Sequence, residues 1–253
     1  MACNTQKILL PNGNAPLRCN VLPALFDLNT AKIFVGELKP RTDQVEKRRY
    51  SWSMVEGGVD VGETPADAAC RELNEEVGVT NPTLLTFARA PLMYCFEDGK
   101  APGARYSGKL YLLGACGVRD SSAINLRSGA DSEGDTFISG DWLPLSKAEE
   151  ALLKNTTSEP RRQFIRDTTA LLRPVEQTLL SLRGRGVSPK VSAQQFYEAL
   201  PPEVAMHYTD HAPSRFPVPS SDDLRLGLQP VRPLVLGVAG QPMSGATPLT
   251  LVH

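Results

Sequence analysis

One stretch, residues 51–79, constrains this chain more than any other. It reads SWSMVEGGVDVGETPADAACRELNEEVGV. Nine of its positions follow the spacing G-x5-E-x7-R-E-U-x-E-E-x-G-U, where U is aliphatic: Gly57, Glu63, Arg71, Glu72, Leu73, Glu75, Glu76, Gly78 and Val79. Seven of these are fixed residue types that average proteins use at about 5–10% each, so a chance match is on the order of one in a million. We call residues 57–79 the box.

Local signals predict a helix that begins within the box at Pro65. Thr64 can cap this helix, Pro65 suits its first position, and Asp67 completes a capping-box pattern near the positive end of the dipole. Gly78 lies where the helix is expected to end. Apolar residues recur on one stripe, with the glutamates on the other side: Ala66, Cys70, Leu73 and Val77. One face should therefore pack, while the other presents carboxylates.

Three glutamates, Glu72, Glu75 and Glu76, stand within two turns of this predicted helix. Like charges at such spacing destabilise a helix unless a cation offsets them. Mg²⁺ meets this need best, because it prefers oxygen ligands and phosphate partners. The alternative is an ordinary solvated face, which is the common interpretation of an isolated Glu-Glu pair. The other box residues in register favour the metal site.

These residues resemble the box of the Nudix hydrolases. The resemblance implies an α/β fold, an α/β/α sandwich with a mixed sheet and a strand-loop-helix catalytic unit, that hydrolyses a pyrophosphate linked to another group. It implies two or more Mg²⁺ ions, with Mn²⁺ as the alternative. By position, the metal ligands would be Gly57 (through its carbonyl), Glu72, Glu75 and Glu76. Arg71 would orient a glutamate, Glu63 would brace the loop, and Glu75 is the favoured base for activating water at phosphorus.

Residues outside the box narrow the resemblance to one branch of the family. They are similar to the bacterial RNA 5′-pyrophosphohydrolases and the plant-type diadenosine tetraphosphate hydrolases over about residues 17–175. The residues that carry this similarity are Arg18, Asn20, Val21, Trp52, the loop 56–63 and Trp142. The expected substrate is therefore the 5′ end of an RNA or a nucleotide.

The sequence departs from that branch at two places. Val55-Glu56 stands where the branch has Pro-Gln, which puts the fine geometry of the loop in doubt. Phe137 follows Asp135-Thr136, where the branch has Glu-Phe. A further acid that replaces Glu75 or binds another metal would thus be either Glu133 or Asp135.

Cationic and aromatic side chains elsewhere are candidates for binding the substrate. Arg18, Lys109 and one of Arg161 or Arg162 are candidate phosphate clamps, because guanidinium groups match phosphate oxygens. Ordinary surface charge is an equal alternative for each of them. Tyr94 is a candidate for stacking on the base at an RNA 5′ end.

Apolar runs predict the elements that surround the box. The segments 18–28 and 32–36, joined by a short turn, predict a hairpin. The run 106–118 predicts a central strand. Residues 147–154 and 159–172 predict two helices that close the domain.

The 253 residues divide into a lead-in at 1–16, a hydrolase domain at 17–180 and a proline-rich extension at 181–253. The extension holds ten of the 21 prolines, and only 193–200 and 203–208 look capable of forming a short helix. Disorder is one interpretation; an arm that wraps the domain or a protein partner is the other.

Composition excludes some classes of function. A net charge of −1 argues against a broad nucleic-acid-coating surface, although it permits reading one RNA end. Five cysteines without a CxxC pair favour a reducing compartment. We see no membrane span and no secretory signal, and expect an intracellular protein, cytoplasmic or mitochondrial, that does not act at a membrane.

Three functions remain in competition at this point. The first is Mg²⁺-dependent hydrolysis of 5′-triphosphorylated RNA, which the sequence does not separate from hydrolysis of dinucleoside polyphosphates. The second is an assembly or RNA-binding subunit whose extension docks a partner; the family resemblance also suggests a mitochondrial mRNA-stability factor of kinetoplastids, which works beside an RNA-binding partner. The third is a nucleotide-pool or diphosphoinositol hydrolase.

Overall fold

The computed structural model describes residues 5–8, 16–38, 52–95, 108–126, 137–187 and 190–218. The strands are β1 (Lys7–Ile8), β2 (Leu17–Asp27), β3 (Ile33–Leu38), β4 (Trp52–Ser53), β5 (Gly57–Gly58), β6 (Thr83–Ala88), β7 (Leu92–Cys95), β8 (Gly108–Val118), β9 (Phe137–Leu143) and β10 (Tyr208–Thr209). The helices are α1 (Pro65–Val77), α2 (Leu145–Leu153), α3 (Glu159–Gly184), α4 (Ala193–Ala199) and α5 (Pro202–Ala205), with a short 3-10 helix η1 at Ser121–Ala123.

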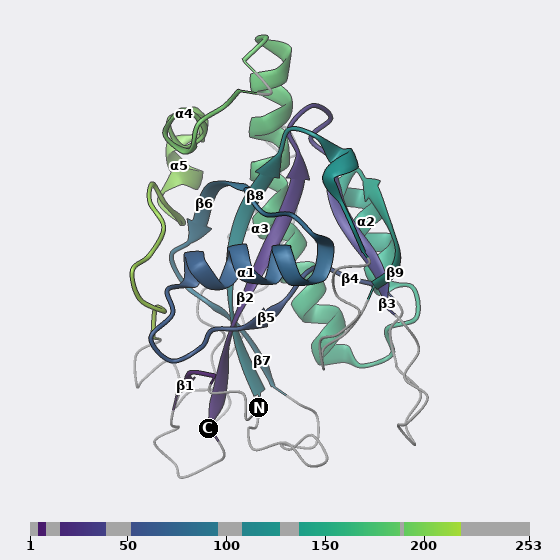
Figure 1. Ribbon diagram of the computed structural model, residues 1–253, viewed down its shortest axis with the longest axis vertical. Coiled ribbons are helices and arrows are strands. Elements are labelled where there is room, and N and C mark those ends of the chain that lie inside the picture. The colour runs from purple at the N-terminus through teal and green to yellow at the C-terminus, as the bar shows by residue number, and fades with distance from the viewer. Residues whose placement is uncertain are drawn as a thin grey trace, which may run out of the picture.

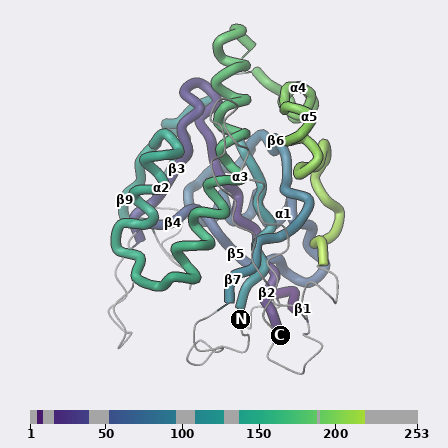
Figure 2. Tube along the Cα trace, turned by 180° about the vertical axis from the view of Figure 1, so that it is seen from behind, coloured from purple at the N-terminus to yellow at the C-terminus, as the bar shows by residue number. Residues whose placement is uncertain are grey.

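The strands form one mixed ten-stranded sheet with helices on both faces (Figure 1). Its main path is β10-β6-β8-β2-β3-β4, while β1 and β5 pair with β2, β7 pairs with β8, and β9 pairs with β3. Helix α1 covers one face, and α2 and α3 cover the other, as the view from behind also shows (Figure 2). The expected α/β sandwich is confirmed.

The two central strands, β2 and β8, are parallel and in register from Leu17–Gly108 to Asp27–Val118. Both read as nearly continuous apolar runs because helices bury both faces of the sheet. In each strand a single position is only partly buried. These positions are Arg18 and Lys109, and they pair with each other. The sheet therefore presents two cations side by side on adjacent strands.

The predicted hairpin is confirmed at its turn. Phe26 pairs with Ile33, and the Asp27 carboxylate accepts hydrogen bonds from the Asn29 backbone N–H and the Thr30 hydroxyl. Beyond this pair, β3 leaves β2 and pairs with β4 and β9. The separation frees the first half of β2 to pair with β5, where the box begins.

Helix α1 has the predicted bounds and caps. The Thr64 hydroxyl accepts a hydrogen bond from the Asp67 N–H, and Gly78 ends the helix in the left-handed conformation with φ 71°. The predicted packing stripe is partly wrong: Leu73 and Val77 are buried, whereas Ala66 and Cys70 are only partly covered. Two alanines that the stripe omitted are fully buried instead, Ala68 and Ala69. The sheet lies under the flank of the helix that carries them.

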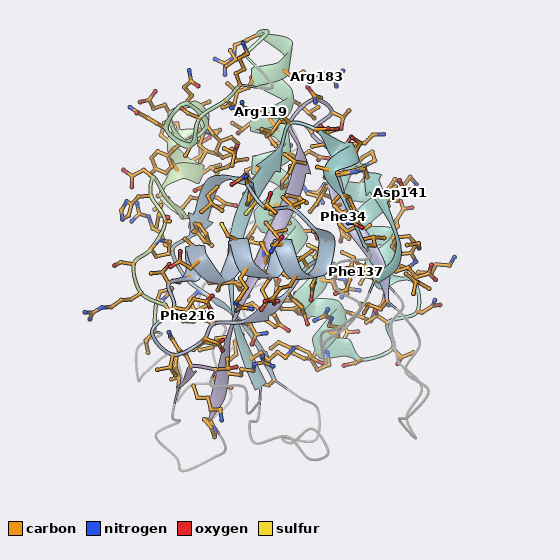
Figure 3. The ribbon with its side chains drawn as sticks, in the orientation of Figure 1. Phe34, Arg119, Phe137, Asp141, Arg183 and Phe216 are labelled. Carbon is orange, nitrogen blue, oxygen red and sulfur yellow. The ribbon has the colours of Figure 1, made fainter. Side chains whose placement is uncertain are left out.

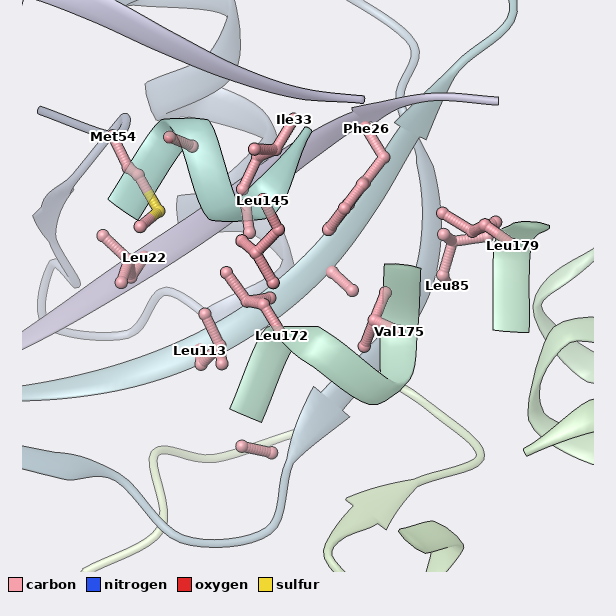
Figure 4. Close-up of a cluster of buried hydrophobic side chains, with 14 of the residues drawn as sticks. Leu22, Phe26, Ile33, Met54, Leu85, Leu113, Leu145, Leu172, Val175 and Leu179 are labelled. Carbon is pink, nitrogen blue, oxygen red and sulfur yellow. The ribbon is translucent and has the colours of Figure 1, made fainter. Parts of the chain in front are cut away.

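The opposite face of the sheet holds the largest apolar cluster (Figure 4). Side chains of β2 and β8, such as Leu22, Phe26 and Leu113, meet Leu172 and Val175 of α3 there. Because α3 continues to Gly184, it passes the expected end of the domain at residue 180. No helix in the described ranges is both long and apolar enough to cross a membrane.

Residues 190–218, within the predicted extension, pack against the domain. The two predicted short helices are confirmed as α4 and α5, and α4 begins with a capping box between Ser192 and Gln195. Strand β10 then pairs antiparallel with β6 at the sheet edge. Phe216 is buried against the cluster under α1, and Figure 3 labels it beside that helix. This part of the chain behaves as an arm that wraps the domain.

Candidate active site

Arg71 lies at the centre of the acidic residues of the box. Its Nε and Nη2 donate to the two carboxylate oxygens of Glu63 at 2.9 and 3.0 Å, and its Nη1 donates to Glu72 at 2.7 Å and to Glu75 at 3.2 Å. Nη2 also donates to the Gly58 carbonyl at 2.7 Å. Hydrogen bonding to Glu63, followed by the charge of Glu72, raises the pKa of Arg71 well above its usual range. Arg71 therefore contacts Glu63, Glu72 and Glu75 at once, and its role in orienting a glutamate stays a prediction.

Glu63 connects Arg71 to the turn that precedes α1. Its second oxygen accepts a hydrogen bond from the Asp60 N–H at 3.0 Å. Gly62 takes φ 89° in this turn, a conformation that suits glycine. Glu63 thus contacts both the turn and Arg71 on the helix. A residue that braces the loop would make contacts of this kind, and the bracing role stays a prediction.

The Glu72 carboxylate packs directly against the backbone of Gly57. A Cβ atom at residue 57 would lie 1.7 Å from the Glu72 Cδ, so only glycine leaves room for this carboxylate. Burial raises the pKa of Glu72, the Arg71 charge lowers it, and Glu75 raises it again. A buried carboxylate beside a second acid is a place where a bound cation would be stabilised.

The donor chemistry of this cluster fits a hard divalent cation, because carboxylates and a backbone carbonyl are the oxygen ligands such ions prefer. Within the described ranges, however, no three His, Cys, Asp or Glu side chains are grouped closely enough to hold an ion. Arg71 forms ion pairs with Glu63, Glu72 and Glu75 in this arrangement, and its charge offsets one of their three negative charges. The ligand set of Gly57, Glu72, Glu75 and Glu76 stays a prediction. Glu133 and Asp135 lie outside the described residues.

A second charged group surrounds Glu56, the residue before Gly57. Its Oε1 lies 3.3 Å from Lys109 Nζ, and its Oε2 lies 3.5 Å from Arg161 Nη1. Burial alone would raise the pKa of Glu56, but the charges of Lys109 and Arg161 and the hydrogen bond from Lys109 lower it to about 2. Glu56 is therefore an ionised carboxylate held between two cations.

The predicted phosphate clamps lie around this group, with one exception. Arg18 is in register with Lys109, and its guanidinium lies within 2.5 Å of where a Cβ at Gly58 would be. Arg161 is buried beside Glu56. Arg162 instead donates to the carbonyls of Thr156 and Leu153, in the connection between α2 and α3. Of the two arginines that the sequence left open, Arg161 is the one that lies in the charged group.

Tyr94, on β7, is in register with Lys109. Its ring centroid lies 5.8 Å from the Arg161 guanidinium carbon and 5.9 Å from the Phe164 ring. The ring thus stands at the border of the charged group, with one cation close to it. Stacking of a base on Tyr94 stays a prediction.

Glu56 is the residue that the sequence did not single out for the site. The one signal was the departure from the branch at Val55-Glu56, which we associated only with loop geometry. Its partners Lys109 and Arg161 come from a strand and a helix more than 50 residues away in the sequence. No local pattern predicts contacts of this kind.

Comparisons with known proteins agree with the box. A family model for the NUDIX domain matches residues 35–168, just over half of the chain. The RNA pyrophosphohydrolase of Acidiphilium cryptum is 38% identical over 136 residues, which are 52% of this chain and 77% of that protein. The RNA pyrophosphohydrolase of Gluconobacter oxydans is 33% identical over 134 residues, 51% of this chain and 72% of that protein.

Among solved structures, a binary complex of a C. elegans Ap4A hydrolase aligns with a TM-score of 0.41 and 17% identity, covering 62% of this chain and 98% of that one. The family model, the two pyrophosphohydrolases and the residues of the box agree on the family of this chain. The chain belongs to the Nudix family and is a hydrolase of pyrophosphate bonds.

Proposed function

We propose that this enzyme removes pyrophosphate or phosphate from 5′-triphosphorylated RNA in a Mg²⁺-dependent reaction, with Mn²⁺ as an alternative ion. The observation that carries the proposal is the pair Arg18–Lys109. Each is the one partly buried residue of its central strand, and the Arg18 guanidinium lies beside Gly58 of the box. The two relatives described above are named RNA pyrophosphohydrolases.

The segment 56–58 separates an acidic group from a cationic one. Gly57 touches Glu72, and Gly58 accepts from Arg71 through its carbonyl. On the other side, Glu56 contacts Lys109 and Arg161. A triphosphate placed across this segment would meet carboxylates that suit metal ions at one end and cations that suit phosphate oxygens at the other.

In this mechanism each group of residues has its own task. Glu72, Glu75, Glu76 and the Gly57 carbonyl would hold two or more divalent ions, which when bound lower the pKa of water and offset charge on phosphate. Glu75, half-exposed and oriented by Arg71, would accept the proton of the attacking water. Glu133 or Asp135 is the alternative base. Arg18, Lys109 and Arg161 would hold the phosphates, and Tyr94 would stack on the first base.

The proposal is tested by Glu76→Gln, because a neutral amide is a poor ligand for a hard cation. We expect this variant to lose all measurable release of phosphate or pyrophosphate from triphosphorylated RNA, while circular dichroism shows an intact fold. Glu150→Gln, which changes an exposed glutamate of α2, is the matched control and should keep full activity. Undiminished turnover of Glu76→Gln would refute the proposal.

The substrate class is decided by a turnover panel with Mg²⁺ and with Mn²⁺. Its members are triphosphorylated RNA, diadenosine tetraphosphate, free nucleotides and a diphosphoinositol phosphate. The highest kcat/KM is expected for RNA. A clear preference for dinucleoside polyphosphates, or for free nucleotides or inositol pyrophosphates, would assign the same catalytic group to one of the two competing hydrolase functions.

We also propose a protein partner for the extension at 181–253, and a role in mRNA stability in the cytoplasm or the mitochondrion. Residues 190–218 are packed against the domain, so deleting all of 181–253 would damage the fold as well as any docking. Deleting 219–253 is therefore the sharper experiment. Loss of a copurifying RNA-binding protein, with unchanged RNA hydrolysis, is the expected result.

A further inference from the structure

Glu56 is a buried acid among the cations that the proposed reaction would use for phosphate. Its side chain is 15% exposed, and those of its partners Lys109 and Arg161 are 18% and 7% exposed. Together the three side chains carry two positive charges and one negative charge. This group is separate from the acids around Arg71, which lie on the other side of Gly57.

Aromatic side chains line the group. The Lys109 ammonium lies 5.4 Å from the centroid of the Tyr111 ring, which is completely buried. The Arg161 guanidinium carbon lies 5.1 Å from the Phe164 ring. Water screens charges poorly in such surroundings, so one unit of charge here changes the attraction for an anion more than it would on an exposed surface.

We infer that Glu56 is a specificity-determining residue, which limits the amount of phosphate charge that Lys109 and Arg161 accept. Its carboxylate holds both cations in place and cancels one of their two positive charges. A phosphate that approaches the three side chains then meets one net positive charge where a neutral residue at position 56 would leave two. This inference rests on the proposed function, because it assigns Lys109 and Arg161 to the phosphates of the substrate.

The competing interpretation is a purely structural ion pair. Losing one member of a buried pair leaves the other charge without compensation, so a structural role predicts that each single loss is harmful. A role in setting charge predicts a different pattern, in which removing Glu56 strengthens anion binding and removing a cation as well reverses the gain. The two interpretations therefore differ in sign.

The test is the binding of inorganic pyrophosphate to the full chain without divalent metal, measured by calorimetry. Four proteins are compared: the unchanged chain, Glu56→Gln, Lys109→Gln and the double variant. The summed charge of residues 56, 109 and 161 is +1, +2, 0 and +1 in these four proteins. We expect Glu56→Gln to bind about tenfold more tightly and Lys109→Gln about tenfold more weakly, which is about 1.4 kcal/mol for one unit of charge. The double variant should return to within about threefold of the unchanged chain.

Two controls separate charge from shape. Glu56→Asp keeps the charge and should bind within about twofold of the unchanged chain. Glu159→Gln removes an exposed acid from the same helix as Arg161 and should have no effect. Equal or weaker binding by folded Glu56→Gln would overturn the inference. If that variant does not fold, a double variant that binds more weakly than Lys109→Gln would overturn it.

RNA turnover connects the inference to catalysis. In Glu56→Gln, the KM for triphosphorylated RNA should fall relative to the KM for diphosphorylated RNA, because the longer phosphate carries more charge. An unchanged chain that binds pyrophosphate but hydrolyses no RNA would count against the proposed function alone. An active chain whose KM ratio is unaffected by Glu56→Gln would count against this inference alone.

Discussion

At Gly57 the absence of a side chain is what lets the Glu72 carboxylate reach the loop. Gly62 and Gly78 suit the backbone conformation at their positions, with φ 89° and 71°. Gly57 is different, because its backbone is in direct contact with the Glu72 carboxylate. The requirement for glycine at this residue is a matter of space rather than of conformation.

Gly57→Ala should therefore displace the Glu72 carboxylate, since the new Cβ would lie 1.7 Å from its Cδ. We expect kcat/KM to fall about a hundredfold, the usual cost of misplacing a catalytic group by about 1 Å. Gly184→Ala, where no atom lies within 4 Å of the added Cβ, should leave activity unchanged. Steady-state kinetics on both variants checks the prediction. Normal activity of Gly57→Ala would show that Glu72 need not contact this backbone.

Glu56 gives a prediction about pH. Its pKa of about 2 in the folded protein lies below the ordinary value of 4.5. A lowered pKa stabilises the fold above the ordinary pKa, and this stability is lost as the pH falls toward the folded value. The unchanged chain should exceed Glu56→Gln in unfolding free energy by on the order of 3 kcal/mol above pH 4.5. The difference should shrink as the pH falls through this range and vanish below pH 2, where Glu56 becomes neutral; urea unfolding across this range decides.

At the scale of elements, the arm at residues 190–218 is part of the folded domain. Strand β10 covers the edge of β6, where the Thr86 hydroxyl donates to the Thr209 carbonyl at 2.7 Å. The Tyr208 hydroxyl also donates to the Leu171 carbonyl on α3. Phe216 then enters the apolar cluster that supports Ala68 and Ala69 of α1. The arm thus joins the sheet edge, α3 and the helix of the box.

Phe216→Ala should destabilise the protein by about 3 kcal/mol, the lower end of the range for removing a buried phenylalanine ring. Val218, two residues further on, is exposed, and Val218→Ala should have little effect. Urea unfolding of the two variants measures the difference. An equal, small change in both would mean that the arm contributes little to the support of α1.

At the scale of the whole molecule, the site joins parts of the chain that are far apart in the sequence. Arg18 comes from β2, Lys109 from β8 and Arg161 from α3, while Glu72, Glu75 and Glu76 come from α1. The mixed sheet brings the first two together, and α3 reaches them by crossing the face opposite to α1. The site is consequently assembled only when both helical layers are in place.

Divalent metal should therefore stabilise the native fold, because the unfolded chain does not hold the acids together. At about a hundred times its Kd, Mg²⁺ would add about 2.7 kcal/mol, or roughly 5 °C in Tm for a chain of this size. Differential scanning calorimetry with and without a chelator measures the shift. It should be retained in Glu150→Gln and lost in Glu72→Gln. A shift that survives in Glu72→Gln would place the bound ion elsewhere.

The sequence alone determined the features that depend on near neighbours. Thr64, Pro65 and Gly78 act within one or two turns, so the bounds of α1 could be predicted from caps and spacing. The spacing of the box residues also carried the resemblance to the Nudix hydrolases, which implied hydrolysis of a pyrophosphate. The apolar run at 106–118 also predicted the central strand β8, since helices on both faces of a sheet require such a strand to be apolar throughout.

Only the tertiary structure decided which distant side chains meet. It selected Arg161 over Arg162 as the arginine beside Glu56, and it made Glu56 part of the site. It also showed that residues 190–218, part of the proline-rich extension, pack against the domain and place Phe216 under α1. The physical reason is the same in each case. Contacts across the sheet depend on strand register and on which face a helix covers. Neither can be predicted from the sequence neighbours of the residues that make the contact.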